Sequence, residues 1–210
     1  MGRRNDIDGR QLLLEAALEL FATHGIEGVS IRAINRAAGL GPASVHYHFG
    51  TKEALVDAVL HVYGDTVIDA VKVRAKEIAQ SEQPTTARDL VTMLAQPYLD
   101  LMASHTSAGQ SWIRLVSQLL QTDPGRVLDR PSAKLTWSAA SRVYPDAAPA
   151  DVQRAMRMCF MLLVTQLAQM GQPGRASSNT LDLDLLIDFL SAGLDAALRP
   201  QQDRVATLSA

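Results

Sequence analysis

Cysteine is nearly absent from this 210-residue sequence, and the one cysteine, Cys159, has no partner in the chain for a disulfide. A secreted fold held together by internal disulfides is therefore excluded, and a reducing cytoplasm is the expected compartment. The N-terminal stretch MGRRNDIDGR lacks the apolar segment of a signal peptide, and no apolar run reaches the roughly 20 residues that span a bilayer. We expect a cytoplasmic protein with no membrane partner.

Sequence motifs of the common enzyme classes are also missing. The chain has no GxSxG, HExxH, phosphate-binding loop or dinucleotide motif, and Cys159 lies within the apolar run 158–164, where its thiol should be inert. His46 and His48 are two residues apart, which places them on different sides of a helix and makes them poor joint ligands for a metal. We predict a non-enzyme with no catalytic residue, no metal site and no cofactor.

The chain has no strong excess of charge of either sign. Its formal net charge is -2 and its pI is near 6.2, which exclude the basic surface of a histone-like protein. Any contact with nucleic acid must then come from a local arrangement of side chains. The hydrophobic content of 47% is sufficient for a core in one elongated domain or two small ones.

What the sequence does contain is helical periodicity almost throughout. The pattern predicts a first helix from about Arg10 to His24, ended by Gly25 in the left-handed conformation. Ser30 is placed to cap a second helix, and Gly39 allows the positive φ of a sharp turn between helices, with Leu40 filling the space behind it. The second helix should direct one apolar set inward: Ile31, Ile34, Ala37 and Ala38.

A short third helix is predicted to start with Gly41 as its N-cap and Pro42 as its first residue. Its inward side chains are Val45 and Phe49. Other side chains are left for outer surfaces, which implies a partner: Pro42, Ala43, Ser44, His46, Tyr47 and His48. Thr51 then caps a fourth helix, and Lys52 in its first turn would be stabilised by a bound phosphate, because the positive end of the helix dipole otherwise disfavours a cation.

Each of these signals taken singly is common in all-α proteins, where Ser30, Gly39 and Thr51 could serve only as helix boundaries. Their order within one short stretch, SIRAINRAAGLGPASVHYHFGTK, favours a DNA-binding helix-turn-helix. The alternative that remains is a helix-turn-helix used as a protein-interaction module without an effector. A gel shift against DNA from upstream of the protein's own gene would separate the two.

The segment LFATHGIEGVSIRAINRAAGLGPASVHYHFGTKEAL resembles the N-terminal DNA-binding domain of TetR-family transcriptional repressors, over roughly the first sixty residues. The resemblance implies an all-helical homodimer: three N-terminal helices that bind operator DNA, and a larger C-terminal domain that binds a small molecule and dimerises. We place the DNA-binding domain at residues 1–52 and the second domain at 53–210, with the fourth helix linking them from 51 onward.

The resemblance also assigns roles to particular residues. Ser30 and Arg32 would contact the DNA backbone or a base from the second helix. Ala43, Ser44 and His48 would face the major groove, while Tyr47 and Lys52 would hold phosphates. The chain departs from the family at Gly41, where Ser or Thr is frequent, so that the third helix has a weaker cap. It departs again at His46, where Tyr is frequent; the position supplies either an aromatic or a titratable contact.

The remainder of the chain resembles no further motif, and its helices are predicted from periodicity alone. The fourth helix should run to about Gln80, a kinked helix with Pro97 should follow over 88–105, and TDPGR should form a turn before a helix over 131–143. We expect a pocket for a small, largely apolar effector among these helices, lined by Met93, Tyr98, Met102, Trp112, Leu115, Met156 and Phe160.

The last two helices, at about 151–170 and 182–198, indicate how the chain assembles. The first is apolar on every side around 158–164, and the second carries a seam of Leu183, Leu186, Leu190, Leu194 and Ala197. A monomer of this size can hardly bury both, so these helices are predicted to pair with their copies in a two-fold four-helix bundle. Two buried helices of a monomer are the alternative.

Overall fold

The computed structural model describes residues 2–104, 107–129, 131–170 and 182–199, and all regular elements in these ranges are α-helices, as predicted. None of the described helices is long and apolar enough to cross a membrane. In chain order the helices of the described ranges are α1 (Gly2–His24), α2 (Ile31–Ala37), α3 (Ser44–Phe49), α4 (Lys52–Gln80), α5 (Ala87–Ala103), α6 (Ser107–Thr122), α7 (Pro124–Leu128), α8 (Pro131–Val143), α9 (Pro149–Met170) and α10 (Leu183–Leu198).

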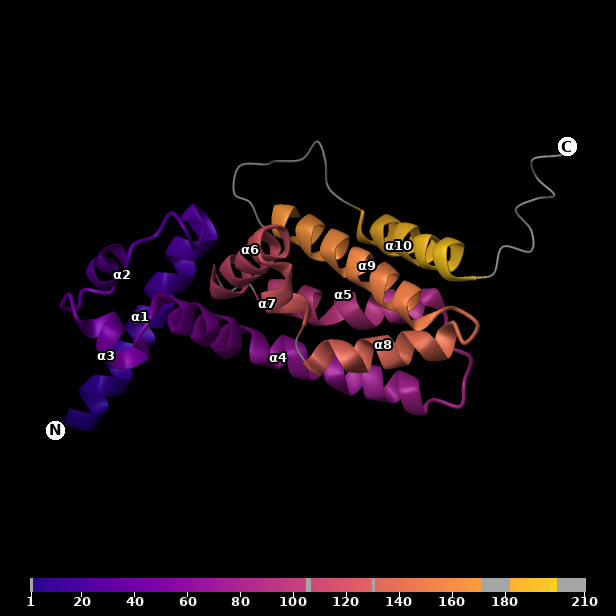
Figure 1. The fold of residues 1–210 in the computed structure, drawn as a ribbon, viewed down its shortest axis with the longest axis horizontal. Helices are drawn as coiled ribbons and strands as arrows, with labels where there is room; N and C mark the ends of the chain where they lie inside the picture. The colour runs from indigo at the N-terminus through magenta and orange to yellow at the C-terminus, as the bar shows by residue number, and fades with distance from the viewer. Residues whose placement is uncertain (1, 105–106, 130, 171–181, 200–210) are drawn as a thin grey trace, which may run out of the picture.

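The molecule is elongated, with a small head and a larger body (Figure 1). Helices α1, α2 and α3 gather at one end around a core that includes Leu13, Phe21 and Ile34, all without exposed surface. Helix α4 starts in this head and continues along the body, where it packs against α5, α6 and α8. The head and the body are therefore joined by one continuous helix as well as by the contact of α1 with α6.

Helix α1 begins at Gly2, well before the predicted start near Arg10. The apolar periodicity that predicts the helix begins only at Leu13, and Asp8 and Gly9 before it are weak helix formers. In the structure Gly9 is buried, and a Cβ at this position would lie 3.3 Å from Nε2 of His48. The absence of a side chain at Gly9 thus lets α3 approach α1 closely, which offsets its low helix propensity.

The TDPGR segment, predicted as a turn, contains the start of the short helix α7. Pro124 occupies the first turn of the helix, where its missing N–H is tolerated, and Arg126 N donates to Asp123 O at 3.2 Å. Leu128 anchors the helix because its side chain is only 6% exposed. Five residues give too short a pattern for periodicity to reveal, whereas the neighbouring helix α8 begins and ends as predicted.

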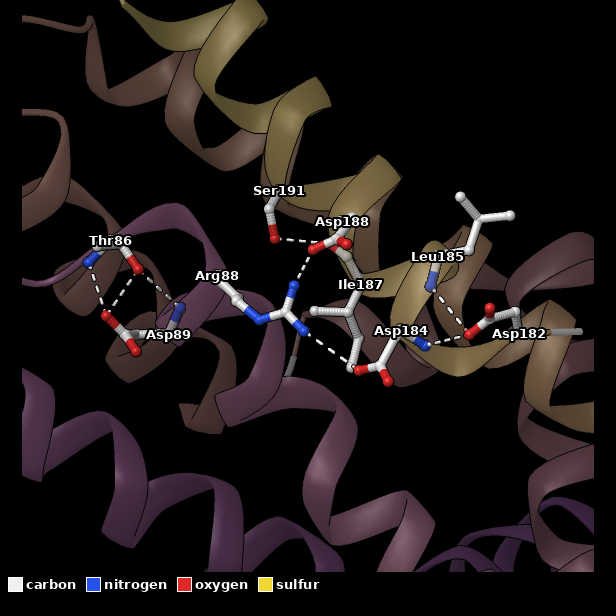
Figure 2. A network of polar contacts seen from close by, with 9 residues as sticks. All are labelled: Thr86, Arg88, Asp89, Asp182, Asp184, Leu185, Ile187, Asp188 and Ser191. Atoms are coloured by element: carbon white, nitrogen blue, oxygen red, sulfur yellow. Dashed lines mark hydrogen bonds and ion pairs between the residues drawn. The ribbon is translucent and has the colours of Figure 1, made fainter.

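Helix α10 is fixed to α5 by a network of polar contacts (Figure 2). The Arg88 guanidinium of α5 lies between the carboxylates of Asp184, at 3.2 Å, and Asp188. The Asp182 side chain caps α10 by accepting from Asp184 N and Leu185 N, and α5 starts in a capping box formed by Thr86 and Asp89. The two caps lie within their own helix ends, so the Arg88 ion pairs are the contacts of this network that link α10 to α5, beside the apolar packing of the two helices.

The seam predicted on α10 is directed differently from the expectation. Leu186, Leu190 and Leu194 are at most 6% exposed and pack inside the same chain, where α10 contacts α5 and α9. The outward stripe of α10 instead carries Leu185 and Phe189, each 65% exposed, followed by exposed Ala192, Gly193, Ala196 and Ala197. Periodicity locates an apolar face on a helix but does not say which neighbour covers it.

Helix α9 contributes an exposed apolar stripe of its own, with Met158 67% exposed and Leu162 36% exposed. Its opposite side is buried and includes Cys159, which is 5% exposed. Burial raises the pKa of the Cys159 thiol to about 12, so that the thiolate is scarce at neutral pH. The arrangement agrees with the inert thiol expected from the apolar run around it.

We expect Cys159 to resist modification in the folded protein. With a free-thiol pKa near 8.5, the shift to about 12 lowers the thiolate fraction at pH 8 by roughly 10³-fold, before restricted access is counted. The rate of reaction with Ellman's reagent should thus rise by at least this factor in denaturant. Equal rates in native and denaturing buffer would contradict the burial, and Cys159→Ser provides the blank.

Candidate functional site

The candidate site is built on the turn between α2 and α3. Ser30 caps α2, with its Oγ accepting from Ala33 N at 3.2 Å, and Gly39 has the positive φ of 68° that the sequence predicted. Ser30 and Arg32 are both exposed at the start of α2. Because the Ser30 oxygen accepts in the cap, its O–H proton can still be donated to a phosphate.

Asn35 holds α2 and α3 together, a role that the sequence did not suggest. Its side chain is 2% exposed, its Nδ2 donates to Pro42 O at 2.6 Å, and its Oδ1 accepts from Val45 N at 3.1 Å. The two hydrogen bonds of this buried amide fix the orientation of α3 on α2, because a buried donor or acceptor without a partner destabilises the fold. Ala37, predicted to face inward, is exposed instead.

Helix α3 begins at Ser44, later than the predicted start at Gly41 and Pro42. Residues 41–44 form a turn closed by Ser44 N donating to Gly41 O at 3.1 Å, and the N-cap residue Ala43 makes no side-chain cap. The bond from Val45 N to Asn35 therefore satisfies one of the N–H groups that an N-cap side chain normally covers. Asn35 supplies from α2 the cap that α3 lacks.

The outer surface of α3 carries the predicted candidate residues. Pro42, Ala43, His46 and Tyr47 are exposed, Tyr47 at 72%, and Ser44 is partly exposed. Val45 is fully buried on the inner side, and Phe49 packs beneath the Arg10 guanidinium of α1 at 5.1 Å. The helix thus has one anchored side and one open side.

The two histidines of α3 occupy different environments. His48 is only partly exposed because it lies against α1 at Gly9, and its ring meets Tyr47 edge to face at 4.9 Å. His46 is exposed, and its Nδ1 lies 2.8 Å from Gly50 O, so that it donates a proton to this carbonyl and leaves Nε2 for another contact. His48 offers an outer partner less of its surface than the sequence analysis assumed.

The N-terminus of α4 lies beside α3. Thr51 caps it, accepting from Ala54 N at 3.1 Å, and Lys52 is its first residue, partly exposed. Residues 30–52 hold Arg32, Arg36 and Lys52 and no acidic side chain, although the chain as a whole has a formal charge of -2. Arg36, exposed on α2, belongs to this local positive segment, and the missing acidic residues were the signal that could have found it.

A second candidate site is a cavity of about 100 Å³ in the body, which is partly open to the surface. Of the predicted pocket residues Tyr98, Trp112, Met156 and Phe160 line it. The ring of Tyr98 stacks on Trp112 at 5.8 Å, and its other ring neighbour is Phe160 at 5.9 Å. The other lining residues, none of which was predicted, come from α4, α7 and α8 and from α5, α6 and α9: Leu60, Val67, Ile68, Val71, Val127, Leu128, Thr136, Trp137, Leu94, Val116 and Arg157.

Three predicted pocket residues lie away from this cavity. Leu115 is fully buried in the core, Met102 packs partly buried against the core, and Met93 borders a separate polar cleft near the end of α4. These three residues have the same helical spacing as the residues that line the cavity, but they lie on faces of their helices that are directed elsewhere. The wall formed by α4 was missed because α4 meets the other lining helices only through contacts between residues far apart in the sequence.

Trp112 connects the cavity to α4. Its Nε1 donates to Leu60 O at 3.3 Å, and a Cβ at Gly64 would lie 2.3 Å from the indole. Only glycine at this position allows the ring to rest on the backbone of α4.

In the described part of the chain no cluster of three or more metal-ligating side chains occurs.

Replacing Asn35 with Ala should lower the free energy of unfolding by about 1–3 kcal/mol, because Val45 N loses its buried acceptor. Gly41→Ser should leave this loss almost unchanged, because residue 41 precedes the N-cap Ala43 and a Cβ there meets only Ser44 Oγ, at 3.9 Å. Urea denaturation and hydrogen exchange of the α3 amides measure both effects. An Asn35→Ala variant with native stability and exchange would show that these bonds contribute nothing.

Comparison with known proteins supports the predicted family. Residues 13–59, which cover the end of α1, α2, α3 and the start of α4, match the family model described as bacterial regulatory proteins, tetR family. The chain is 34% identical over 119 residues to the HTH-type transcriptional regulatory protein RaaS of Mycobacterium tuberculosis, covering 57% of this chain and 53% of that protein. It is 30% identical to the HTH-type transcriptional repressor AcnR of Corynebacterium diphtheriae, covering 69% and 64%.

The matches thus span less than two thirds of each of these relatives. The fold is similar over nearly the whole chain to the crystal structure of a TetR family transcription regulator from Marinobacter aquaeolei, with a TM-score of 0.58, 20% identity, and coverage of 92% of this chain and 97% of the other. The helix-turn-helix segment, residues 13–59, is thus that of the tetR family of bacterial regulatory proteins, and the all-helical fold of the chain is similar to that of a solved TetR family regulator.

Proposed function

We propose that the protein is a transcriptional regulator, a repressor, that binds a palindromic DNA operator as a homodimer and is released by a small, largely apolar effector. The observation that carries the proposal is the open side of α3, with Tyr47 72% exposed, within the stretch 30–52 that has three basic and no acidic side chains. Such a surface suits the anionic backbone of DNA. The names of RaaS and AcnR, a regulatory protein and a repressor of transcription, agree with it.

In this proposal the candidate residues divide between backbone and base contacts. Tyr47, Lys52 and the residues at the start of α2, Ser30 and Arg32, hold phosphates and set the position of α3 on the duplex. Pro42, Ala43 and Ser44, at the leading end of α3, approach base edges in the major groove, with His46 and His48 beside them. Asn35 contacts no DNA and keeps α3 at the angle that this docking needs.

The homodimer forms through the outward stripes of α9 and α10. Leu185, Phe189, Met158 and Leu162 are large apolar side chains left open on adjacent helices of one chain, and the exposed small residues Ala192, Gly193 and Ala196 permit close helix approach. Two such helix pairs make a four-helix bundle around a two-fold axis. The axis would set the two copies of α3 roughly 34 Å apart, one helical turn of DNA.

The effector acts from the cavity on α4. Four residues of α4 line the cavity, Trp112 rests on Gly64, and Gln118 of α6 donates to Ala22 O of α1 at 2.9 Å. An occupant that favours one position of α4 shifts the equilibrium between two spacings of the heads by the ratio of its affinities for the two states. Operator affinity falls by the same factor.

Lys52→Ala should weaken binding to all DNA sequences alike and reduce the magnitude of the log–log salt slope by about 1 per protomer, whereas Ser44→Ala should change the preference among operator variants. Gel shifts with DNA from upstream of the protein's own gene, at several salt concentrations, measure both. Lys76→Ala is the matched control, since Lys76 is exposed on the same helix α4 but far from the head. If no fragment shifts even at low salt, the helix-turn-helix binds protein and not DNA.

Phe189→Asp should convert the dimer to a monomer, because a carboxylate would be buried without a partner at the centre of the bundle. Sedimentation or light scattering gives the mass directly. Val73→Asp is the control, since Val73 is an apolar residue 55% exposed on α4, away from α9 and α10. A Phe189→Asp chain that remains dimeric would place the interface elsewhere.

A further inference from the structure

The polar groups of the body cavity are few, and only one of them is charged. Its lining is aliphatic and aromatic apart from Thr136 and Arg157, and Tyr98 adds a phenol hydroxyl. Arg157 is the only charged residue that lines it in the described part of the chain, and no described carboxylate does. The cavity thus combines an apolar interior with a single positive charge.

Arg157 lies where the cavity meets the surface. It comes from α9, its side chain is 33% exposed, and its NH2 group is 3.4 Å from Oδ1 of Asp129, which is 64% exposed. A guanidinium has five N–H donors, and this single contact at the surface engages few of them. The ion pair therefore holds the arginine in position without saturating it.

Electrostatics then distinguish among the molecules that could fill the cavity. A carboxylate entering a mostly apolar space is stabilised only where a cation meets it, and an arginine offers two parallel hydrogen bonds to it. A neutral molecule would cover part of Arg157 without replacing its water, and an amine would be repelled. Acids should bind better than alcohols, and alcohols better than amines.

We infer that the effector is an amphipathic acid, with a compact hydrocarbon body against Tyr98, Trp112 and Phe160 and a carboxylate bound by Arg157. This inference rests on the proposed function, since it names the chemical class of the effector. It also assigns a role to Asp129, which competes with the acid for the same guanidinium. Removing Arg157 should therefore weaken acid binding, and removing Asp129 should strengthen it.

Octanoate, octan-1-ol and octylamine are suitable probes because they share a chain and differ in head-group charge. Both tryptophans of the sequence, Trp112 and Trp137, line the cavity, so intrinsic fluorescence reports its occupancy. Octanoate should bind about tenfold more tightly than octan-1-ol, because one charge-assisted hydrogen bond contributes a free energy of this order. Octylamine should bind more weakly than either. Arg157→Gln should remove the preference for the acid while binding of the alcohol stays unchanged.

Asp129→Asn should strengthen octanoate binding about threefold or more, with little effect on the alcohol, and this variant serves even if Arg157→Gln is poorly folded. Arg154→Gln is the matched control, since Arg154 lies on the same helix, pairs with Asp151 at 3.4 Å, is 72% exposed and does not line the cavity. Equal binding of octanoate and octan-1-ol, or an acid preference that survives in Arg157→Gln, would overturn the inference.

Gel shifts on the same samples separate this inference from the proposed function. Octanoate that binds through Arg157 but leaves the DNA complex intact supports the acid site and contradicts the effector role. Octan-1-ol that binds equally well and releases DNA supports the effector role and contradicts the acid class. Fluorescence that none of the three probes changes would overturn the cavity as a ligand site, and with it both statements about the effector, while leaving DNA binding unaffected.

Discussion

One unbroken helix belongs to both parts of the molecule, and the rest of the structure is arranged around this constraint. Helix α4 begins at Lys52, beside α3, and its central residues Leu60 and Val67 form a wall of the body cavity. In the proposed function, this continuity is the path by which a change at the cavity moves the head. The α1–α6 contact, which includes the Gln118 bond to Ala22, gives the head a second support and limits how it can move.

Local signals in the sequence were sufficient for most of the helical framework. Ser30, Gly39 and Thr51 act within three or four residues of themselves, and each has the capping or turn role that its chemistry predicts. The family resemblance added what periodicity could not, namely the expectation that the exposed polar side of α3 contacts DNA. The start of α1 was placed too late because the reason for Gly9, the approach of His48, lies 39 positions along the chain.

Contacts between distant residues explain the other differences. Asn35 looked like an ordinary polar residue of a short helix, yet its partners across the turn make it the cap of the next helix. The leucine seam of α10 was correctly identified as apolar, but α5 and α9 of the same chain cover it, which leaves Leu185 and Phe189 outside. Likewise the cavity draws on six helices, and spacing on a single helix selected Leu115 and Met102 as readily as Trp112.

The isolation of Cys159 has a practical consequence. A thiol with a pKa of about 12 and 5% exposure cannot compete with a surface cysteine for a thiol-directed label. A cysteine introduced at Ala43, on the exposed leading end of α3, would therefore carry a nitroxide alone in each chain. If two chains pair as proposed, dipolar coupling between the two spins would give the separation of their α3 helices in solution, with the cavity empty or filled.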